Sequence, residues 1–198
     1  STTEPDADLI LRTNFSLSRD LWDWCALRDA RMIYASSAAT YGDGEAGFAD
    51  DDSLEALTTL KPLNAYGYSK MLFDQHAARQ SGRGQSPRQW AGLKFFNVYG
   101  PNEYHKGGMK SVVAQIWPKV QAGEMVSLFR SHNPNYPDGG QLRDFVYVDD
   151  VVNIIEWLLQ TPDVSGVFNA GSGQARSFAD LARATFAAAG KEPSITYV

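Results

Sequence analysis

Tyr66 and Lys70, in the stretch YGYSK (66–70), are the residues of this sequence best spaced for acid–base chemistry. Residues four positions apart on a helix share a face, so the two side chains can reach one site. An ammonium beside a phenol favours the phenolate and lowers the tyrosine pKa from its ordinary value of about 10. Tyr66 would then be a competent general base. Tyr68 lies on the other side of such a helix, and a tyrosine packed in the core would show the same spacing as Tyr66.

Ser37 strengthens the catalytic interpretation. It ends the apolar run RMIYASS (31–37), a predicted buried strand that comes about 30 residues before Tyr66. In parallel sheets ligands bind beyond the carboxyl ends of the strands. A hydroxyl there can share a proton with Tyr66 and with a substrate oxygen.

Lys106 is a second candidate for moving a proton. It lies in PNEYHKGG (101–108), a turn-rich stretch with neither helical nor strand periodicity. Taken alone, the stretch fits an ordinary solvated loop cation. It follows the strand end that carries Asn97, so we expect it beside the site that Ser37, Tyr66 and Lys70 define.

The elements that must position these residues alternate between short apolar runs and amphipathic stretches. The spacing predicts helices over 14–29, 65–80, 109–122, 151–160 and 178–190, and strands over 31–37, 91–100, 143–148, 166–173 and 193–198. In the first helix the spaced apolar residues are Leu17, Leu21, Trp24 and Leu27. Pro118 should bend or end the third helix, and Asp149 or Asp150 should cap the fourth, as Ser177 caps the fifth.

Strands that are apolar on both faces and alternate with helices indicate an α/β fold, a Rossmann-like parallel sheet with helices on both faces. Small and polar residues follow its strands, as Ser36-Ser37, Asn97 and Asn169-Ala170-Gly171. The turn-rich segment 131–142 is a surface loop or a substrate lid.

Composition excludes several classes of protein. Of 198 residues 43% are hydrophobic and 21% charged, which is typical of globular proteins, and a net charge of −5 without a basic face argues against a nucleic-acid partner. No apolar run approaches the roughly 20 residues that span a bilayer, so we expect a soluble cytoplasmic protein without a membrane partner. The one cysteine, Cys25, is expected to be a buried packing residue. The three histidines show no metal-ligand spacing, and no metal site is expected.

Five stretches carry a family resemblance: YASSAATYG (34–42), KPLNAYGYSK (61–70), FFNVYGPNEYHKGGM (95–109), RDFVYVDDVV (143–152) and GVFNAGSG (166–173). A strand-end Ser followed by a helical Tyr-x-x-x-Lys resembles the short-chain dehydrogenase/reductase superfamily. The whole set is similar to its extended nucleotide-sugar branch, and most of all to the ADP-glyceromanno-heptose 6-epimerase family. The resemblance runs through essentially all 198 residues.

The resemblance implies a role for each matching residue. Tyr66 matches the catalytic tyrosine, Lys70 the lysine that also binds the nicotinamide ribose, Ser37 the substrate-binding serine and Lys106 a second catalytic base. Cofactor contacts fall on Val98 and on Thr13 or Asn14, whose register stays open. Substrate contacts fall on Ser37, Asn97, Gly108, Gln115, Phe129 and Arg143. Gly108 and Gln115 stand where the family has Ser and His. Arg143 is a candidate clamp for a diphosphate, or simply an exposed Arg that opens a strand.

The resemblance also implies an incomplete fold. Family members begin with a Gly-rich turn that cradles the cofactor pyrophosphate, and this sequence contains no G-x-x-G-x-x-G. We therefore expect the first βαβ units and a shorter C-terminal piece to be missing, and the isolated chain to be inactive. Residues 1–100 would form the C-terminal part of the NAD(P)-binding domain. Residues 101–198 would mainly form a small substrate-binding subdomain, with 143–170 returning to the Rossmann sheet.

The implied reaction inverts C6 of the heptose in ADP-D-glycero-D-manno-heptose, giving the L-glycero form for lipopolysaccharide core synthesis. The cofactor would be NADP, with NAD as the alternative, and the implied assembly is a homo-oligomer, a pentamer in the family. Two other interpretations stay open. One is another nucleotide-sugar enzyme, such as a UDP-glucose 4-epimerase or a dehydratase. The other is a non-catalytic cofactor-binding protein with the same fold. Dehydratases place an acidic pair after the strand-end Ser or Thr, and SSAATYGDG has no acid next to its Ser.

Overall fold

The computed structural model describes residues 4–198, which divide into two compact units. Of the described residues, 4–96 and 153–170 form the first unit, and 97–152 and 171–198 form the second. Each unit combines two segments that are distant in the sequence. No helix in the described part of the chain is both long and apolar enough to cross a membrane.

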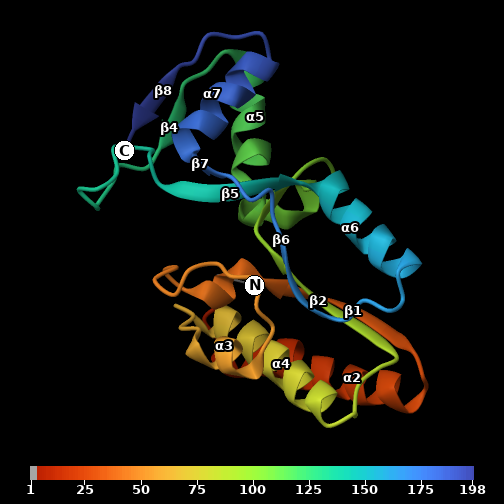
Figure 1. The fold of residues 1–198 in the computed structure, drawn as a ribbon. Coiled ribbons are helices and arrows are strands. Elements are labelled where there is room, and N and C mark those ends of the chain that lie inside the picture. Colours follow the sequence, from red (N-terminus) through yellow and green to blue (C-terminus); the bar gives the residue numbers. More distant parts are fainter. Residues whose placement is uncertain (1–3) are drawn as a thin grey trace. The chain divides into compact units, whose positions relative to one another are not determined.

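The first unit is built on a three-stranded parallel sheet (Figure 1). Its strands are β1 (Arg31–Ser37), β2 (Gln89–Phe95) and β6 (Gly166–Ala170), in the order β1-β2-β6. Its other elements are α1 (Ala7–Ile10), the π-helical turn η1 (Leu11–Ser16), α2 (Leu17–Leu27), the 3₁₀ turn η2 (Ala38–Tyr41), α3 (Leu54–Thr59), α4 (Ala65–Gly82) and most of α6 (Val148–Gln160).

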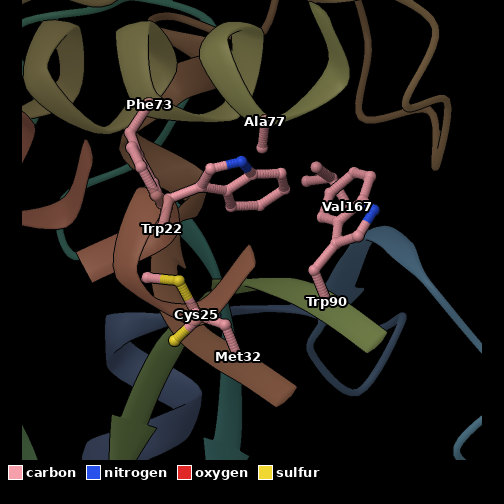
Figure 2. Packing of buried hydrophobic residues seen from close by; sticks show 7 residues of the cluster. All are labelled: Trp22, Cys25, Met32, Phe73, Ala77, Trp90 and Val167. Atoms are coloured by element: carbon pink, nitrogen blue, oxygen red, sulfur yellow. The ribbon is translucent and has the colours of Figure 1, made fainter. Parts of the chain in front are cut away.

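Helices cover both faces of this sheet. Neighbouring residues of a strand point to opposite sides, so β2 contributes side chains to the packing on each face. On one face Trp90 of β2 packs with residues of α2 and α4, in a cluster of Trp22, Cys25, Met32, Phe73, Ala77, Trp90 and Val167 (Figure 2). On the other face Ala91 and Leu93 pack against Leu158 of α6. The predicted α/β class with helices on both faces of a parallel sheet is confirmed, as is the burial of Cys25.

The second unit holds shorter strands around α5 (Val112–Ala122) and α7 (Phe178–Ala188). Strand β5 (Leu142–Tyr147) pairs in parallel with β3 (Asn97–Tyr99) and antiparallel with β7 (Ala175–Ser177), while β4 (Val126–Leu128) pairs in parallel with β8 (Ile195–Tyr197). The 3₁₀ segment η3 (Tyr104–Met109) precedes α5. The core of the unit consists of Ile116, Val120, Val126, Leu128, Ala179, Ala182 and Phe186.

The helix predicted over 14–29 forms, but it buries a different face from the one that its spacing suggests. Leu17, Leu21, Trp24 and Leu27 are all exposed, Leu27 by 86%. Trp22 and Cys25 are buried instead. Trp22 fits between α4 and the sheet, where its Nε1 donates to the carbonyl of Gln85 at 3.0 Å.

The strand predicted over 91–100 is two strands separated at Phe96. Strand β2 belongs to the sheet of the first unit, whereas β3 pairs with β5 in the second unit. Within 143–170, β6 pairs with β2, and β5 pairs with β3 and β7.

Pro118 lies inside α5, which continues to Ala122 with Ile116 and Val120 buried on either side of the proline, so of the two expected effects the ending of the helix does not occur. One prediction about a helix cap is wrong. Asp149 and Asp150 do not precede α6, which begins at Val148, so they lie in its first turn. Ser177 does cap α7, and its hydroxyl forms a capping box with Asp180.

The segment 131–142 lies between β4 and β5 and forms a turn-rich loop that extends into the first residue of β5. Asp138 accepts a hydrogen bond from the backbone N–H of Ser131 at 2.8 Å, and Gly139 donates to the carbonyl of Phe129 at 3.1 Å. These bonds close the loop on itself at its base.

Candidate active site

Helix α4 presents Tyr66 in its first turn and Lys70 one turn later. The helix begins at Ala65 because the side chain of Asn64 accepts a hydrogen bond from the N–H of Gly67 at 2.8 Å. The Nζ atom of Lys70 lies 5.8 Å from the centre of the Tyr66 ring, so both side chains lie on one helix face. Lys70 also donates a 2.8 Å hydrogen bond to the carbonyl of Ala35 in β1.

Ser37 ends β1, where its Oγ accepts a hydrogen bond from the N–H of Ala39 at 3.2 Å and so caps the turn η2. Helix α4 approaches this turn very closely at Gly67. A Cβ at that position would lie 2.7 Å from the carbonyl oxygen of Ala39. The glycine of YGYSK therefore allows the helix carrying Tyr66 to contact the turn that follows Ser37.

The electrostatics of Lys70 depend on its burial and on Asp74, one turn further along α4. Desolvation lowers the pKa of the Lys70 ammonium, and the charge of Asp74 opposes that shift. Burial raises the pKa of Asp74 to about 6, although Ser36, Lys94, Tyr34 and Lys70 all act to lower it. We did not predict Asp74 as a site residue, because in the sequence it is an ordinary polar residue of a helix.

The two alternatives for the cofactor contact near residue 13 differ in their surroundings. Thr13 is exposed, and its Oγ1 donates to the carbonyl of Leu9 at 2.8 Å within its own helical segment. Asn14 is half-buried, and its Nδ2 donates to Ser69 Oγ at 3.0 Å. Asn14 is thus tied to the helix that carries Tyr66 and Lys70.

Lys106 lies in η3 of the second unit, where the buried carboxylate of Glu103 organises the segment. This carboxylate accepts hydrogen bonds from the N–H of Gly100 (3.3 Å) and from the N–H (2.8 Å) and Oγ (2.6 Å) of Ser111. The Nζ of Lys106 lies 3.4 Å from the same carboxylate. Burial acts to raise the pKa of Glu103, but the bonds from Ser111 and Gly100 and the charge of Lys106 outweigh it and hold the pKa below its ordinary value. Glu103 is a second residue that we did not predict, although it stands in the same short stretch as Lys106.

The remaining predicted substrate and cofactor residues also lie in the second unit. Asn97 and Val98 are in β3, Gly108 is in η3, Gln115 is in α5, Phe129 follows β4, and Arg143 is in β5. The Nε2 of Gln115 donates to the carbonyl of Lys110 at 2.7 Å and to that of Gly108 at 3.4 Å, so the amide N–H groups of this side chain are engaged within the second unit. The ring of Phe129 is 78% exposed.

Arg143 stands directly opposite Arg176 in the β5–β7 ladder. Its guanidinium lies 5.9 Å from the centre of the Phe178 ring and donates to the carbonyl of Leu142. Among residues 4–198, no carboxylate lies within ion-pair distance of this guanidinium. The arginine therefore keeps N–H donors available for an anion.

Comparisons with known proteins place the chain in a family. Residues 2–171 match the model of the NAD dependent epimerase/dehydratase family. The chain is 53% identical over 198 residues to the ADP-L-glycero-D-manno-heptose-6-epimerase of Nitratidesulfovibrio vulgaris, and it spans 59% of the length of that relative.

Two solved structures are also similar. The crystal structure of the ADP-L-glycero-D-manno-heptose-6-epimerase of Helicobacter pylori superposes with a TM-score of 0.78 at 31% identity, covering 100% of this chain and 57% of the other. The UDP-glucose 4-epimerase of Thermus thermophilus, in complex with NAD, gives a TM-score of 0.65 at 28% identity, covering 87% of this chain and 52% of the other. The chain therefore belongs to the NAD dependent epimerase/dehydratase family.

Proposed function

We propose that the protein epimerises ADP-D-glycero-D-manno-heptose at C6 to the L-glycero form, with NADP as its cofactor and NAD as the alternative. The observation that carries the proposal is the placement of Lys70. Its ammonium lies between the Tyr66 ring and the carbonyl of Ala35, the β1 residue directly before Ser36-Ser37. The 53% identity to an ADP-L-glycero-D-manno-heptose-6-epimerase supports the choice of substrate.

The residues of the first unit fit a nicotinamide cofactor. Lys70 has three N–H donors, and one of them is used by the Ala35 carbonyl, so donors remain for the hydroxyls of a ribose. The amide of Asn14, fixed to Ser69, lies on the adjoining helical segment, and we favour it over Thr13 as a cofactor contact. A nicotinamide cofactor held by these residues would supply reversible hydride transfer at the substrate carbon.

Proton transfer is the task of the protein's own side chains. The carbinol C–H at C6 is not acidic, so inversion proceeds through a ketone, and the hydroxyl proton leaves in one orientation and returns in the other. A single fixed base serves both orientations poorly, whereas two bases solve the geometry. We assign Tyr66, whose ring lies beside the Lys70 ammonium, as one base and Lys106 as the other, while Ser37 donates to the substrate oxygen.

Arg143 is our candidate for binding the diphosphate of the substrate. A guanidinium can hold two phosphate oxygens at once, and no carboxylate of the described chain competes for this one. Asn97, Gly108, Gln115 and Phe129 are assigned to the remainder of the substrate, with Gly108 contributing only backbone groups. In this assignment the first unit is mainly a cofactor-binding region and the second mainly a substrate-binding region.

The decisive experiment incubates the purified full-length protein with ADP-D-glycero-D-manno-heptose and follows the C6 configuration by NMR. We expect conversion to a mixture with the L-glycero form, and release of NADP or NAD from the denatured protein, identified by mass spectrometry. Turnover of UDP-galactose without any conversion of the heptose would contradict the proposed substrate. A protein that turns over neither, with cofactor bound, would favour the non-catalytic interpretation.

A further inference from the structure

Asp74 is a fully buried carboxylate that none of the proposed proton transfers uses. It follows Tyr66 and Lys70 on α4 at the same spacing of four, so the three side chains lie along one face of the helix. An acid without any exposed surface, one turn from a catalytic lysine, calls for a physical reason.

Its contacts join α4 to the strand that ends in Ser37. The carboxylate accepts hydrogen bonds from Ser36 Oγ at 2.6 Å and from Tyr34 OH at 3.0 Å. Between them, the carbonyl of Ala35 accepts from Lys70. Three consecutive residues of β1 are therefore bound by two residues of α4, immediately before Ser37.

The room for this arrangement comes from Gly92, which pairs with Tyr34 in the parallel ladder of β1 and β2. A Cβ on Gly92 would lie 2.4 Å from the Tyr34 ring and its hydroxyl. The absence of a side chain on Gly92 thus leaves room for the ring and hydroxyl of Tyr34.

Ammonium or hydroxyl groups face Asp74 from α4, β2 and β1. Lys70 comes from α4 itself, Lys94 from β2, and the hydroxyls of Tyr34 and Ser36 from β1. Lys94 is only 2% exposed, and its Nζ lies 4.3 Å from the centre of the Tyr41 ring. Beyond these groups, the negative charge of Asp52 interacts with Tyr34, and that of Asp50 interacts with Lys94 and Tyr41.

A residue that served only as a structural brace, holding β1 against α4 by hydrogen bonds, would not need a charge at this position. Burying a carboxylate and two ammonium groups carries a large desolvation cost, and an Asn of the same shape can bond the same two hydroxyls. What only the carboxylate supplies is a negative charge beside Lys70. That charge favours the ammonium form of a half-buried lysine, and so keeps a positive charge beside the Tyr66 ring.

We infer that Asp74 is a positioning residue of the active site: it fixes β1 and Ser37 against α4, and its charge keeps Lys70 protonated beside Tyr66. The inference rests on the proposed roles of Tyr66 and Lys70. Because burial raises the pKa of Asp74 to about 6, we expect its influence on Lys70 to be present above that pH and to be lost as the pH falls below it.

The test measures the proton affinity of Lys70 directly in the full-length protein. Trace labelling with an amine-reactive reagent at a series of pH values, read by mass spectrometry, gives the pKa of each lysine, and it needs no substrate. In Asp74→Asn we expect the Lys70 pKa to fall by about one unit, so that the neutral fraction at pH 8 rises about tenfold. The alkaline limb of kcat should move to lower pH by the same amount, with KM changing less than kcat.

Tyr34→Phe is the matched control, because it removes one hydrogen bond to the carboxylate and leaves the charge in place. We expect it to lower the melting temperature while Lys70 reactivity stays within twofold of wild type. If Asp74→Asn and Tyr34→Phe both lower the melting temperature and neither changes the reactivity of Lys70, Asp74 is a structural brace only and the inference is wrong.

Two further measurements cover the case in which Asp74→Asn does not fold. The double variant Asp74→Asn/Lys94→Met also removes the second buried charge, and its Lys70 should show the same tenfold change. In wild type, Lys70 reactivity should fall less steeply below about pH 6 than the tenfold per pH unit expected of an isolated amine. A uniform tenfold slope from pH 8 to pH 5 in wild type overturns the inference. Failure of heptose conversion would sink the proposed function while leaving these labelling results intact.

Discussion

Lys70 holds its ammonium 5.8 Å from the centre of the Tyr66 ring, on the face of α4 that packs toward β1. The bond to the Ala35 carbonyl fixes this position within the first unit alone. The pairing of Lys70 with Tyr66 is therefore a property of the fold and does not require a bound ligand.

Replacing Tyr66 with Phe in the full-length protein should reduce kcat for heptose epimerisation about 10²- to 10⁴-fold, because one general base is lost. The melting temperature should stay close to that of wild type, since the Tyr66 ring is kept. Tyr68→Phe is the control: its side chain is 47% exposed two positions further along, and kcat should not change. Equal losses in both variants would mean that Tyr66 is not the base.

Lys106→Met should likewise lower kcat by at least about 10²-fold, because the second proton carrier is lost. Lys110→Met, in the same segment, should retain near-native kcat. Stopped-flow absorbance of the cofactor adds a sharper readout. If only one direction of proton transfer needs Lys106, the variant should still oxidise one epimer. A near-native kcat for Lys106→Met would eliminate the two-base mechanism.

Glu103→Gln should destabilise the protein in a pH-dependent way. The folded state holds the pKa of Glu103 below its ordinary value of 4.5, so its contribution is present above that value and is lost as the pH falls through the folded pKa. At pH 7 we expect a loss of about 1–3 kcal/mol for a buried charge-assisted network. Urea unfolding at pH 7 and at pH 3.5 checks this, and an identical difference between wild type and variant at both pH values would refute it.

Trp22 and Trp24 should differ sharply in their contribution to stability, although only one residue separates them. Trp22 has no exposed surface and packs with Phe73 and Trp90, so Trp22→Ala should cost about 3–5 kcal/mol. Trp24 is 55% exposed, and Trp24→Ala should cost less than about 1 kcal/mol. Denaturant unfolding of the two variants measures the difference, and similar losses would show that the α2 face is assigned wrongly.

The same helix shows what sequence patterns can and cannot settle. Helical spacing predicts the helix over 14–29, but two sets of apolar residues have that spacing, and the buried set is the one with Trp22 and Cys25. The choice depends on packing against α4 and the sheet, which lie far along the chain. Similarly, AGLKFFNVYG is one continuous apolar run, and nothing local marks Phe96 as the point where the chain leaves one sheet for another.

The sequence offers candidates for catalysis more readily than it offers the buried carboxylates that the structure places near them. Tyr66 and Lys70 have a spacing with a chemical meaning, and Ser37 ends a recognisable strand. Asp74 and Glu103 have no such pattern, because a buried carboxylate is justified only by distant donors such as Tyr34 and Ser111. The buried face of α4 is also hard to predict from hydrophobic spacing, because it includes the polar residues Ser69, Asp74 and Gln75.

The break at Phe96 has a consequence for synthesis of the chain on the ribosome. The chain passes from one unit to the other after residues 96, 152 and 170. β6 is synthesised only after all of residues 97–152, so one edge of β2 stays unpaired until then. The second unit in turn cannot pair β4 with β8 until the last residues of this sequence appear. Neither unit can therefore be completed before the other has begun, and a single proteolytic cut cannot release either of them intact.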